Sequence, residues 1–249
     1  VFLILMSLVI LMPMLLMVST SIKAPGESDR NRGLIPEQVE FHKFIEVWVD
    51  ARVPMLGRNS IIITAGTVIA LLFLASLTAY AFARLDFALK NVLYFVLLAG
   101  LMIPGAAVIL PLYQLNVRYG LMNSYAALIG PYVALGMPFS VLLLRGFFEG
   151  LPGELEDAAL IDGASRFTIY WRILLPLTKP ALVTVAIFQG LHAWNDFLLP
   201  TLFLTKWEMR TLPLGIIWYA TLYIVRHEHR FALMVIMTIP VLILFLVAQ

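Results

Sequence analysis

The chain has 249 residues, of which 61% are hydrophobic and only 13% are charged, and its mean hydropathy is +0.93. A water-soluble fold of this length does not have enough interior to hide that much apolar surface, so the composition excludes a soluble enzyme and also a disordered chain. The net charge of +2 provides no field that would recruit nucleic acid, and the lack of Cys excludes disulfides, thiolate metal sites and a Cys nucleophile. The class that remains is an integral membrane protein.

Stretches without Asp, Glu, Lys or Arg predict where the chain crosses a membrane, because a bilayer core needs about 20 mostly apolar residues in a helix. Five such stretches occur, and a sixth is interrupted only by Asp196. The six stretches are residues 1–22, 59–83, 91–117, 119–144, 180–205 and 231–249. Hydrocarbon offers the backbone no partner, and the stretches lack the alternation of barrel strands, so we expect helices. We predict an all-α polytopic membrane protein in which 1–249 is a single domain with six transmembrane helices.

Four further expectations concern the spans and their neighbours. Residues 1–22 lack the basic start and small-residue exit of a signal peptide, so we expect a span there. Ala75, Ala79 and Ala83 form a stripe that lets helices approach closely. The shorter apolar run 211–225 is expected to lie at the interface or to fold into an extramembrane loop. Four prolines are expected to interrupt and bend the third and fourth spans, either opening a cavity or simply reflecting membrane-helix composition. They are Pro104, Pro111, Pro131 and Pro138.

Residues 149–179 have the pattern of a helical hairpin. Acidic residues at the start favour a helix over about 154–162, and Gly163 ends it because Gly adopts the left-handed conformation without penalty. Ser165 is expected to cap a second helix that ends at Pro176. The residues alone leave open whether this is an ordinary hairpin at the membrane surface.

The hairpin resembles the EAA loop of the permeases of ABC importers, in which E-A-A is followed by three residues, a Gly, nine residues and I-x-L-P. The matching residues are Asp157, Ala158, Ala159, Gly163, Ile173, Leu175 and Pro176. The one departure is Asp157, which keeps the usual negative charge of Glu on a shorter arm. The resemblance implies that these residues, with Asp162, form a cytoplasmic coupling hairpin that sits in a cleft of an ATPase.

Other stretches extend the resemblance over most of the chain, among them "LTAYAFARLDF", "PLYQLNVRYGLMNSYAALIGPY" and "AWNDFLLPTLFLT". Together they are similar to the shorter, six-span permease of maltose-type carbohydrate importers, the MalG type. This implies a permease that forms the path for a di- or oligosaccharide across the plasma (inner) membrane of a prokaryote. The implied partners are a homologous second permease, two ATPase subunits, an extracytoplasmic substrate-binding protein and the lipid bilayer. The resemblance also implies that 202–230 is an extracytoplasmic loop.

Three other functions stay open on the sequence alone. A permease of the same type that imports glycerol phosphate would share these motifs. An ion-coupled carrier would need inverted repeats, which are not visible here. A membrane enzyme would need a nucleophile beside a base, and Ser140 and His192 lack such a context. The sequence has no G-x-x-x-x-G-K-[ST] phosphate loop, so we expect a transport subunit without a cofactor, with ATP and Mg²⁺ bound by a partner ATPase.

Polar residues at the end of the fifth span are candidates for the substrate path. Gln189, His192 and Asp196 lie on one helical face, and a carboxylate within a span usually faces a cavity or a partner. The other candidates, at the ends of the fifth and third spans, are Trp194, Asn195, Tyr113, Gln114 and Asn116. The alternative is a subunit contact or an anchor at the outer interface. We expect no metal site at His227 and His229, which lack H-E-x-x-H spacing and suit a solvated loop.

Overall fold

A computed structural model describes residues 2–219 and 226–248 of the chain. Two compact units make up the fold, one from Val1–Ile61 with Leu204–Gln249 and the other from Ile62–Phe203. Helices dominate both units, and the described ranges contain no strand, only an isolated antiparallel bridge between Lys23 and Val39. Four helices are long and apolar enough to cross a membrane, and the number rises to six when each of two bent helix pairs is one span. The prediction of an all-α polytopic membrane protein is confirmed.

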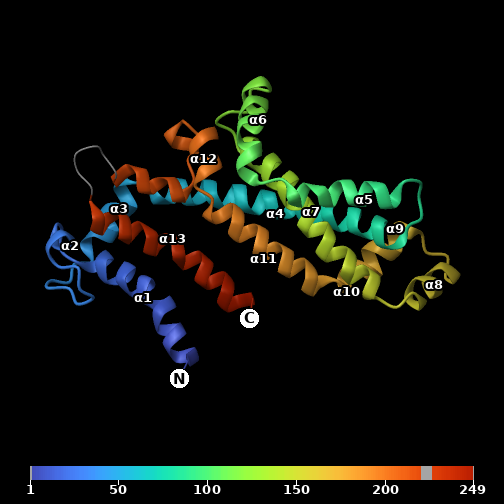
Figure 1. Cartoon of the computed structure of the whole chain (residues 1–249), viewed down its shortest axis with the longest axis horizontal. Helices are drawn as coiled ribbons and strands as arrows, with labels where there is room; N and C mark the ends of the chain where they lie inside the picture. Colours follow the sequence, from blue (N-terminus) through green and yellow to red (C-terminus); the bar gives the residue numbers. More distant parts are fainter. Residues whose placement is uncertain (1, 220–225, 249) are drawn as a thin grey trace. The chain divides into compact units, whose positions relative to one another are not determined.

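The first unit is built around helix α13, which contacts α1, α3 and the 3₁₀ segment η4 (Figure 1). Because α1 and α13 are apolar on all sides, both keep large exposed hydrophobic surfaces, as spans that face lipid do. The unit also contains the first two turns of the long helix α4. Its elements are α1 (Phe2–Ile22), α2 (Glu27–Arg30), α3 (His42–Asp50), η3 (Trp207–Met209), η4 (Leu212–Tyr219) and α13 (His227–Ala248).

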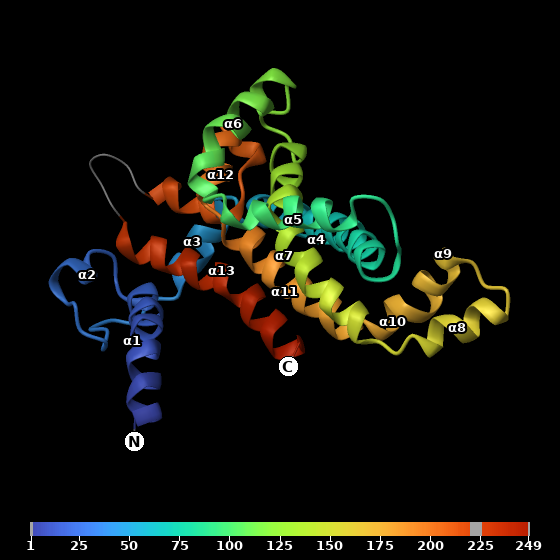
Figure 2. The same cartoon turned by 45° about the vertical axis from the view of Figure 1, so that its right-hand side comes forward.

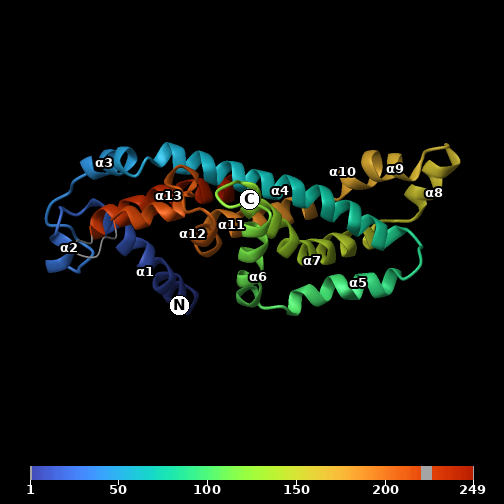
Figure 3. The ribbon, with the colours of Figure 1, turned by 90° about the horizontal axis from the view of Figure 1, so that it is seen from above.

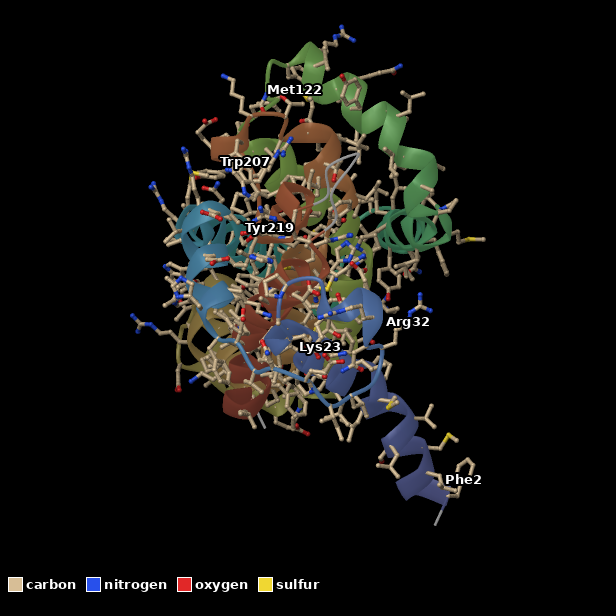
Figure 4. The ribbon with its side chains drawn as sticks, turned by 90° about the vertical axis from the view of Figure 1, so that its left-hand side faces the viewer. Phe2, Lys23, Arg32, Met122, Trp207 and Tyr219 are labelled. Carbon is tan, nitrogen blue, oxygen red and sulfur yellow. The ribbon has the colours of Figure 1, made fainter. Side chains whose placement is uncertain are left out.

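A loop of this unit is held by buried charged groups. Lys23 is 1% exposed, and its ammonium donates to the carbonyls of Asn31 at 2.6 Å and Gly33 at 2.7 Å. Glu27 is equally buried, and its carboxylate accepts from the backbone amide of Glu37 at 2.7 Å. In Figure 4, Lys23 lies within this loop, whereas Phe2 projects from the first turn of α1 and is 70% exposed. These charges of the loop are therefore buried together with their hydrogen-bond partners.

The second unit holds most of α4 (Val53–Arg84), against which the hairpin and the central helix α7 pack (Figures 1 and 2). Ala75 and Ala79 are fully buried in its core, which confirms the packing stripe. Figure 3 shows α5 alongside α7, and the two helices are in contact. The elements after α4 are α5 (Lys90–Ala99), η1 (Gly100–Met102), α6 (Gly105–Arg118), α7 (Ala126–Gly150), α8 (Glu154–Ile161), α9 (Arg166–Ile169), a π-helical turn η2 (Tyr170–Leu174), α10 (Leu175–Leu177), α11 (Lys179–Asn195) and α12 (Leu198–Phe203).

Of the predicted proline interruptions, only one is found. The segment ending at η1 and helix α6 meet at 101° across Pro104, which precedes α6 in an extended conformation. Pro111 lies inside α6, and Pro131 and Pro138 lie inside α7, so the prediction that these three interrupt a helix is wrong. Proline in a membrane helix is tolerated when neighbouring groups take over the freed carbonyl.

The hairpin's second arm also runs further than predicted. It continues through Pro176 to Leu177, and the bend of 74° before α11 falls at Thr178 rather than at the proline.

Several span boundaries differ from the charge-free stretches. Helix α4 begins at Val53 rather than 59, because exposed Arg58 sits on a helical turn that a charge count excludes. Helix α7 begins at Ala126 rather than 119, because Gly120 and Asn123 adopt positive φ angles of 65° and 61° that end a helix. The fifth span ends earlier, at Asn195, and α13 begins earlier, at His227. The run 211–225 folds as η4 over its first part, and residues 220–225 lie outside the described residues.

Candidate functional site

The predicted hairpin is formed by α8 and the arm from α9 to α10, which lie at the end of α7 (Figure 2). Helix α8 ends at Ile161, and Gly163 has a φ of +79°, so the left-handed turn is confirmed. The amide of Gly163 donates to Leu160 at 3.0 Å, and the amide of Ala164 donates to Ala159 at 2.9 Å. These bonds satisfy carbonyls that the end of a helix leaves free. The left-handed Gly163 therefore gives the hairpin a sharp turn after α8.

The second arm begins at the predicted cap. The side chain of Ser165 accepts a hydrogen bond from the amide of Thr168 at 3.2 Å, which confirms its capping role. Tyr170 is buried and its hydroxyl lies 2.8 Å from the Ser76 hydroxyl on α4. Of the motif residues on this arm, Ile173 and Leu175 are half-buried against the core, whereas Pro176 is exposed. The arm therefore anchors the hairpin to the membrane helices.

Helix α8 turns one face to the protein and the other to solvent. Ala159 is 7% exposed and packs into the core of the unit, whereas Ala158 is exposed. The prediction that the two alanines form one small outer face is therefore wrong for Ala159, because adjacent residues on a helix point about 100° apart. Asp157 and Asp162 are exposed, and Ile161 is 87% exposed. The outer face carries two acids, one small residue and an apolar tip.

A buried ion pair that the motif does not include joins α8 to the spans. The Arg84 Nε atom lies 3.0 Å from Oε1 of Glu156, and the side chains are 17% and 7% exposed. Arg84 also donates through Nη2 to the carbonyl of Phe148 at 2.6 Å and to the carbonyl of Leu151. Sequence reasoning missed both residues. The available signal was a lone Arg at the end of a span and an acid just before the motif.

The path candidates of the fifth span meet α7. The Tyr132 hydroxyl donates to Oδ2 of Asp196 at 2.7 Å, and the rings of Tyr132 and His192 lie 5.9 Å apart, edge to face. The Gln189 amide lies against Gly136, where an added Cβ would be 2.8 Å from its Oε1. The three residues predicted to share a face therefore do so, and that face contacts α7. Tyr132, 1% exposed, is the residue of this cluster that the sequence did not indicate.

The other path candidates do not join this cluster. Trp194 is 9% exposed, and Asn195 is exposed. Asn116 is buried and donates to the carbonyl of Ala127 at 3.2 Å, so its amide joins the end of α6 to α7. Tyr113 and Gln114 are exposed on α6. Asn116 thus has a structural partner that explains it without a substrate.

His227 and His229 lie at the start of α13 rather than in a solvated loop, so that expectation is corrected. His229 is 3% exposed, and its Nε2 lies 2.9 Å from Oε2 of Glu46. The hydrogen bond from His229 holds the pKa of Glu46 below its usual value. Within the described ranges, no group of three His, Cys, Asp or Glu residues is placed to hold a metal ion. His229 thus joins α13 to α3.

Comparison with known proteins identifies the family. Residues 71–249 match the family described as "Binding-protein-dependent transport system inner membrane component", which is more than two thirds of the chain. The chain belongs to this family. It is therefore a membrane permease subunit of an ABC importer, a transport component rather than an enzyme, and it resides in the inner membrane. Family membership removes the ion-coupled carrier and the membrane enzyme from the alternatives.

Relatives match along almost the whole chain. The diacetylchitobiose uptake system permease protein NgcG of Streptomyces coelicolor is 34% identical over 99% of this chain and 82% of its own length. The arabinooligosaccharides transport system permease protein AraQ of Halalkalibacterium halodurans is 36% identical over 95% of this chain and 86% of its own. A chain of a bacterial ABC transporter that imports the acidic polysaccharide alginate has the same fold, with a TM-score of 0.86, 23% identity and coverage of 100% and 92%. A binding protein and an ATPase belong to such systems.

Proposed function

We propose that this permease forms part of the translocation path for a di- or oligosaccharide delivered by an extracytoplasmic binding protein. The observation that carries the proposal is the match of 34% and 36% identity, nearly end to end, to permeases named for diacetylchitobiose and for arabinooligosaccharides. A homologous second permease completes the path. Two ATPase subunits drive it and bind the ATP and Mg²⁺, because this sequence has no phosphate loop.

The outer face of α8 supports a coupling role for the hairpin 149–179. Asp157, Ala158 and Asp162 are exposed next to the apolar tip at Ile161, while the opposite face is packed into the core. A helix with one free face, stopped sharply by Gly163, suits insertion into a cleft of the ATPase. ATP-driven closure of that cleft then acts directly on the hairpin.

The cluster around Asp196 supports a neutral sugar rather than glycerol phosphate. His192 is exposed and Gln189 is half-buried, so both offer hydrogen-bonding groups beside the Asp196 carboxylate, which the Tyr132 hydroxyl holds in place. Sugar hydroxyls can donate to a carboxylate, whereas a phosphate would be repelled by it. Glycerol phosphate import stays the competing substrate class, and the two differ in a direct measurement.

The test is uptake by the reconstituted transporter. The chain, its partner permease and the ATPases are placed in liposomes with the cognate binding protein, and radiolabelled oligosaccharides and glycerol 3-phosphate are supplied in parallel. We expect oligosaccharide uptake that requires ATP and stops when the ATPase is inactivated. Uptake of glycerol 3-phosphate alone would overturn the sugar assignment, and uptake without ATP hydrolysis would overturn the importer mechanism.

Cross-linking tests the coupling hairpin, since the native chain has no Cys to interfere. Ala158→Cys is exposed and should cross-link to a Cys placed in the ATPase cleft, whereas Ala159→Cys, on the buried side of the same turn, should not. If Ala158→Cys never cross-links in any nucleotide state, α8 is not the helix that meets the ATPase.

A further inference from the structure

One guanidinium joins three helices at the base of the hairpin. Arg84 is the last residue of α4, and Glu156, in the first turn of α8, lies 3.0 Å away in a nearly buried ion pair. The same side chain donates to the carbonyls of Phe148 and Leu151, where α7 ends. A helix end leaves these carbonyls without helical partners, so Arg84 supplies the donors that a further helical turn would have supplied. The ends of α4 and α7 and the start of α8 thus share one side chain.

The second arm of the hairpin is tied to the same region of α4. The Tyr170 hydroxyl lies 2.8 Å from the Ser76 hydroxyl, and the Tyr170 ring lies 5.2 Å from the ring of Tyr80. Across the hairpin, Nη1 of Arg166 lies 3.3 Å from Oε2 of Glu156. Both arms therefore contact the C-terminal half of α4, and they are linked to each other through Glu156.

The chemistry of this contact makes it rigid. The planar guanidinium holds the two carbonyls in fixed directions through its hydrogen bonds and holds Glu156 beside it by charge, unlike an apolar contact, along which helices can slide. Separating a buried pair leaves an uncompensated charge in a low-dielectric site, which is strongly unfavourable. A displacement of α8 is therefore easier with α4 and α7 following than with the pair broken.

We propose that Arg84 and Glu156 are positioning residues that transmit movement of the coupling hairpin to α4 and α7. The inference rests on the proposed function, because it presumes that the ATPase moves α8. The motif residues on the outer face meet the ATPase, and the Arg84–Glu156 pair passes the displacement inward.

The number of substrate molecules imported per ATP hydrolysed measures directly how well movement of the hairpin is transmitted to α4 and α7. In the complete reconstituted transporter, Glu156→Gln removes the charge and keeps the shape, and Arg84→Lys keeps the charge but loses the planar fork. We expect the number of substrate molecules imported per ATP hydrolysed to fall about tenfold in Glu156→Gln and less in Arg84→Lys. The matched control is Glu149→Gln, because Glu149 forms an exposed ion pair with Arg145 at 2.8 Å near the same end of α7.

A merely structural role would give a different result. A residue needed only for folding would lower the yield of assembled complex, and import and ATP hydrolysis would fall in proportion. Their ratio would then stay at the wild-type value, and that outcome would overturn the inference. An unchanged ratio in a fully assembled Glu156→Gln complex would do the same. If Glu149→Gln lowered the ratio of import to ATP hydrolysis equally, the effect would not be specific to the Arg84–Glu156 pair and the inference would fail.

A distance measurement covers the case in which Glu156→Gln does not assemble. Spin labels at Asp86→Cys, just beyond α4, and Ile161→Cys, at the tip of α8, are both exposed, and the chain has no other Cys. In a complex whose other subunits lack Cys, we expect one distance that is the same in every nucleotide state, and a state-dependent distance after Arg84→Lys. A distance that changes with nucleotide state while Arg84 is intact would show that α8 moves independently of α4, and it would overturn the inference. Failure of ATP-driven uptake by the wild type would instead sink the proposed function.

Discussion

Gly163 adopts a φ of +79°, and nothing lies within 4 Å of the position that a Cβ would take. The cost of Gly163→Ala is therefore purely conformational, about 1–2 kcal/mol. We expect this variant to lower the melting temperature of the purified permease and to weaken its association with the ATPase.

The matched control is Gly153→Ala at the other end of α8. Gly153 has a φ of −66° and equally open surroundings, so Ala should be neutral or slightly stabilising. Equal melting temperatures for the two variants would contradict a conformational requirement at Gly163.

Asp196 accepts hydrogen bonds from the Tyr132 hydroxyl at 2.7 Å and from the Leu198 amide at 2.9 Å. Asp196→Asn keeps the size but leaves a single, uncharged side-chain oxygen, so only one of the two donors keeps its acceptor. We expect import to fall by about tenfold, the usual cost of losing one charge-assisted hydrogen bond. Tyr132→Phe should have a similar effect, whereas Tyr113→Phe, on the exposed side of α6, should have none. Import at the wild-type rate by a normally assembled Asp196→Asn complex would remove Asp196 from the path.

Helices α7 and α11 pack closely at Gly136. A Cβ there would lie 2.8 Å from Oε1 of Gln189 and 2.9 Å from Cδ2 of Leu71. We expect Gly136→Ala to destabilise the permease by about 1–3 kcal/mol, as overpacking does. Gly130→Ala, in the same helix with nothing within 4 Å, should instead stabilise it slightly. Thermal unfolding of both variants in detergent measures this difference in stability. A stabilising effect of Gly136→Ala would show that α7 and α11 can move apart at this position without cost.

The contact of α3 with α13 should make stability depend on pH. The pKa of Glu46 is lowered below 4.5 by the hydrogen bond with His229, so the folded state favours the carboxylate. This stabilisation is present above about pH 4.5 and is lost as the pH falls through the lowered pKa. We expect Glu46→Gln to reduce the loss of melting temperature on acidification, whereas Glu37→Gln, an exposed neighbour, should not. Identical acid profiles for wild type and Glu46→Gln would contradict the linkage.

Most elements could be predicted from the sequence because lipid imposes a simple rule on composition. Charge-free stretches located the four helices that are long enough to cross a membrane and the two bent helix pairs, and Gly163 and Ser165 located the hairpin turn and its cap. The rule marks only the apolar part of a helix, so it missed the start of α4, which precedes the charged Arg58, and the charged first turn of α13. It also could not show that Pro131 and Pro138 lie inside a helix, because that depends on neighbours that a single sequence does not reveal.

The candidate sites were predictable only in part. The helical spacing of Gln189, His192 and Asp196 correctly placed them on one face, because 3.6 residues make a turn. Their partner Tyr132 comes from another span, and the Arg84–Glu156 pair joins positions distant in sequence. Such pairings arise from tertiary packing, and no local pattern encodes them.

At the scale of the whole molecule, the permease must also receive substrate from its binding protein. The expected extracytoplasmic loop 202–230 contains η4, whose Leu212 and Leu214 are buried, so deletions there would unfold it. Trp218 is 46% exposed and its ring lies 4.8 Å from that of Trp207, which makes a surface anchor of the kind that dominates interfaces.

We expect Trp218→Ala to raise at least about tenfold the concentration of binding protein that half-stimulates ATP hydrolysis. Trp48→Ala on α3 is the control, because Trp48 is similarly exposed at 49%. The same half-stimulating concentration for Trp218→Ala and wild type would show that the binding protein docks elsewhere.

The contacts that Arg84 makes with α7 and α8 have a consequence for biosynthesis. Its hydrogen-bond acceptor Phe148 lies 64 positions later in the chain, so at about 5–20 residues per second the ribosome needs several seconds to supply it. During that interval the Arg84 cation at the end of α4 has no partner from α7 or α8, and its charge disfavours entry of this end into hydrocarbon. Only when α7 and α8 have followed does the guanidinium reach the two carbonyls and the Glu156 carboxylate. These contacts of Arg84 therefore form only late in synthesis, after α7 and the start of α8 have been added to the chain.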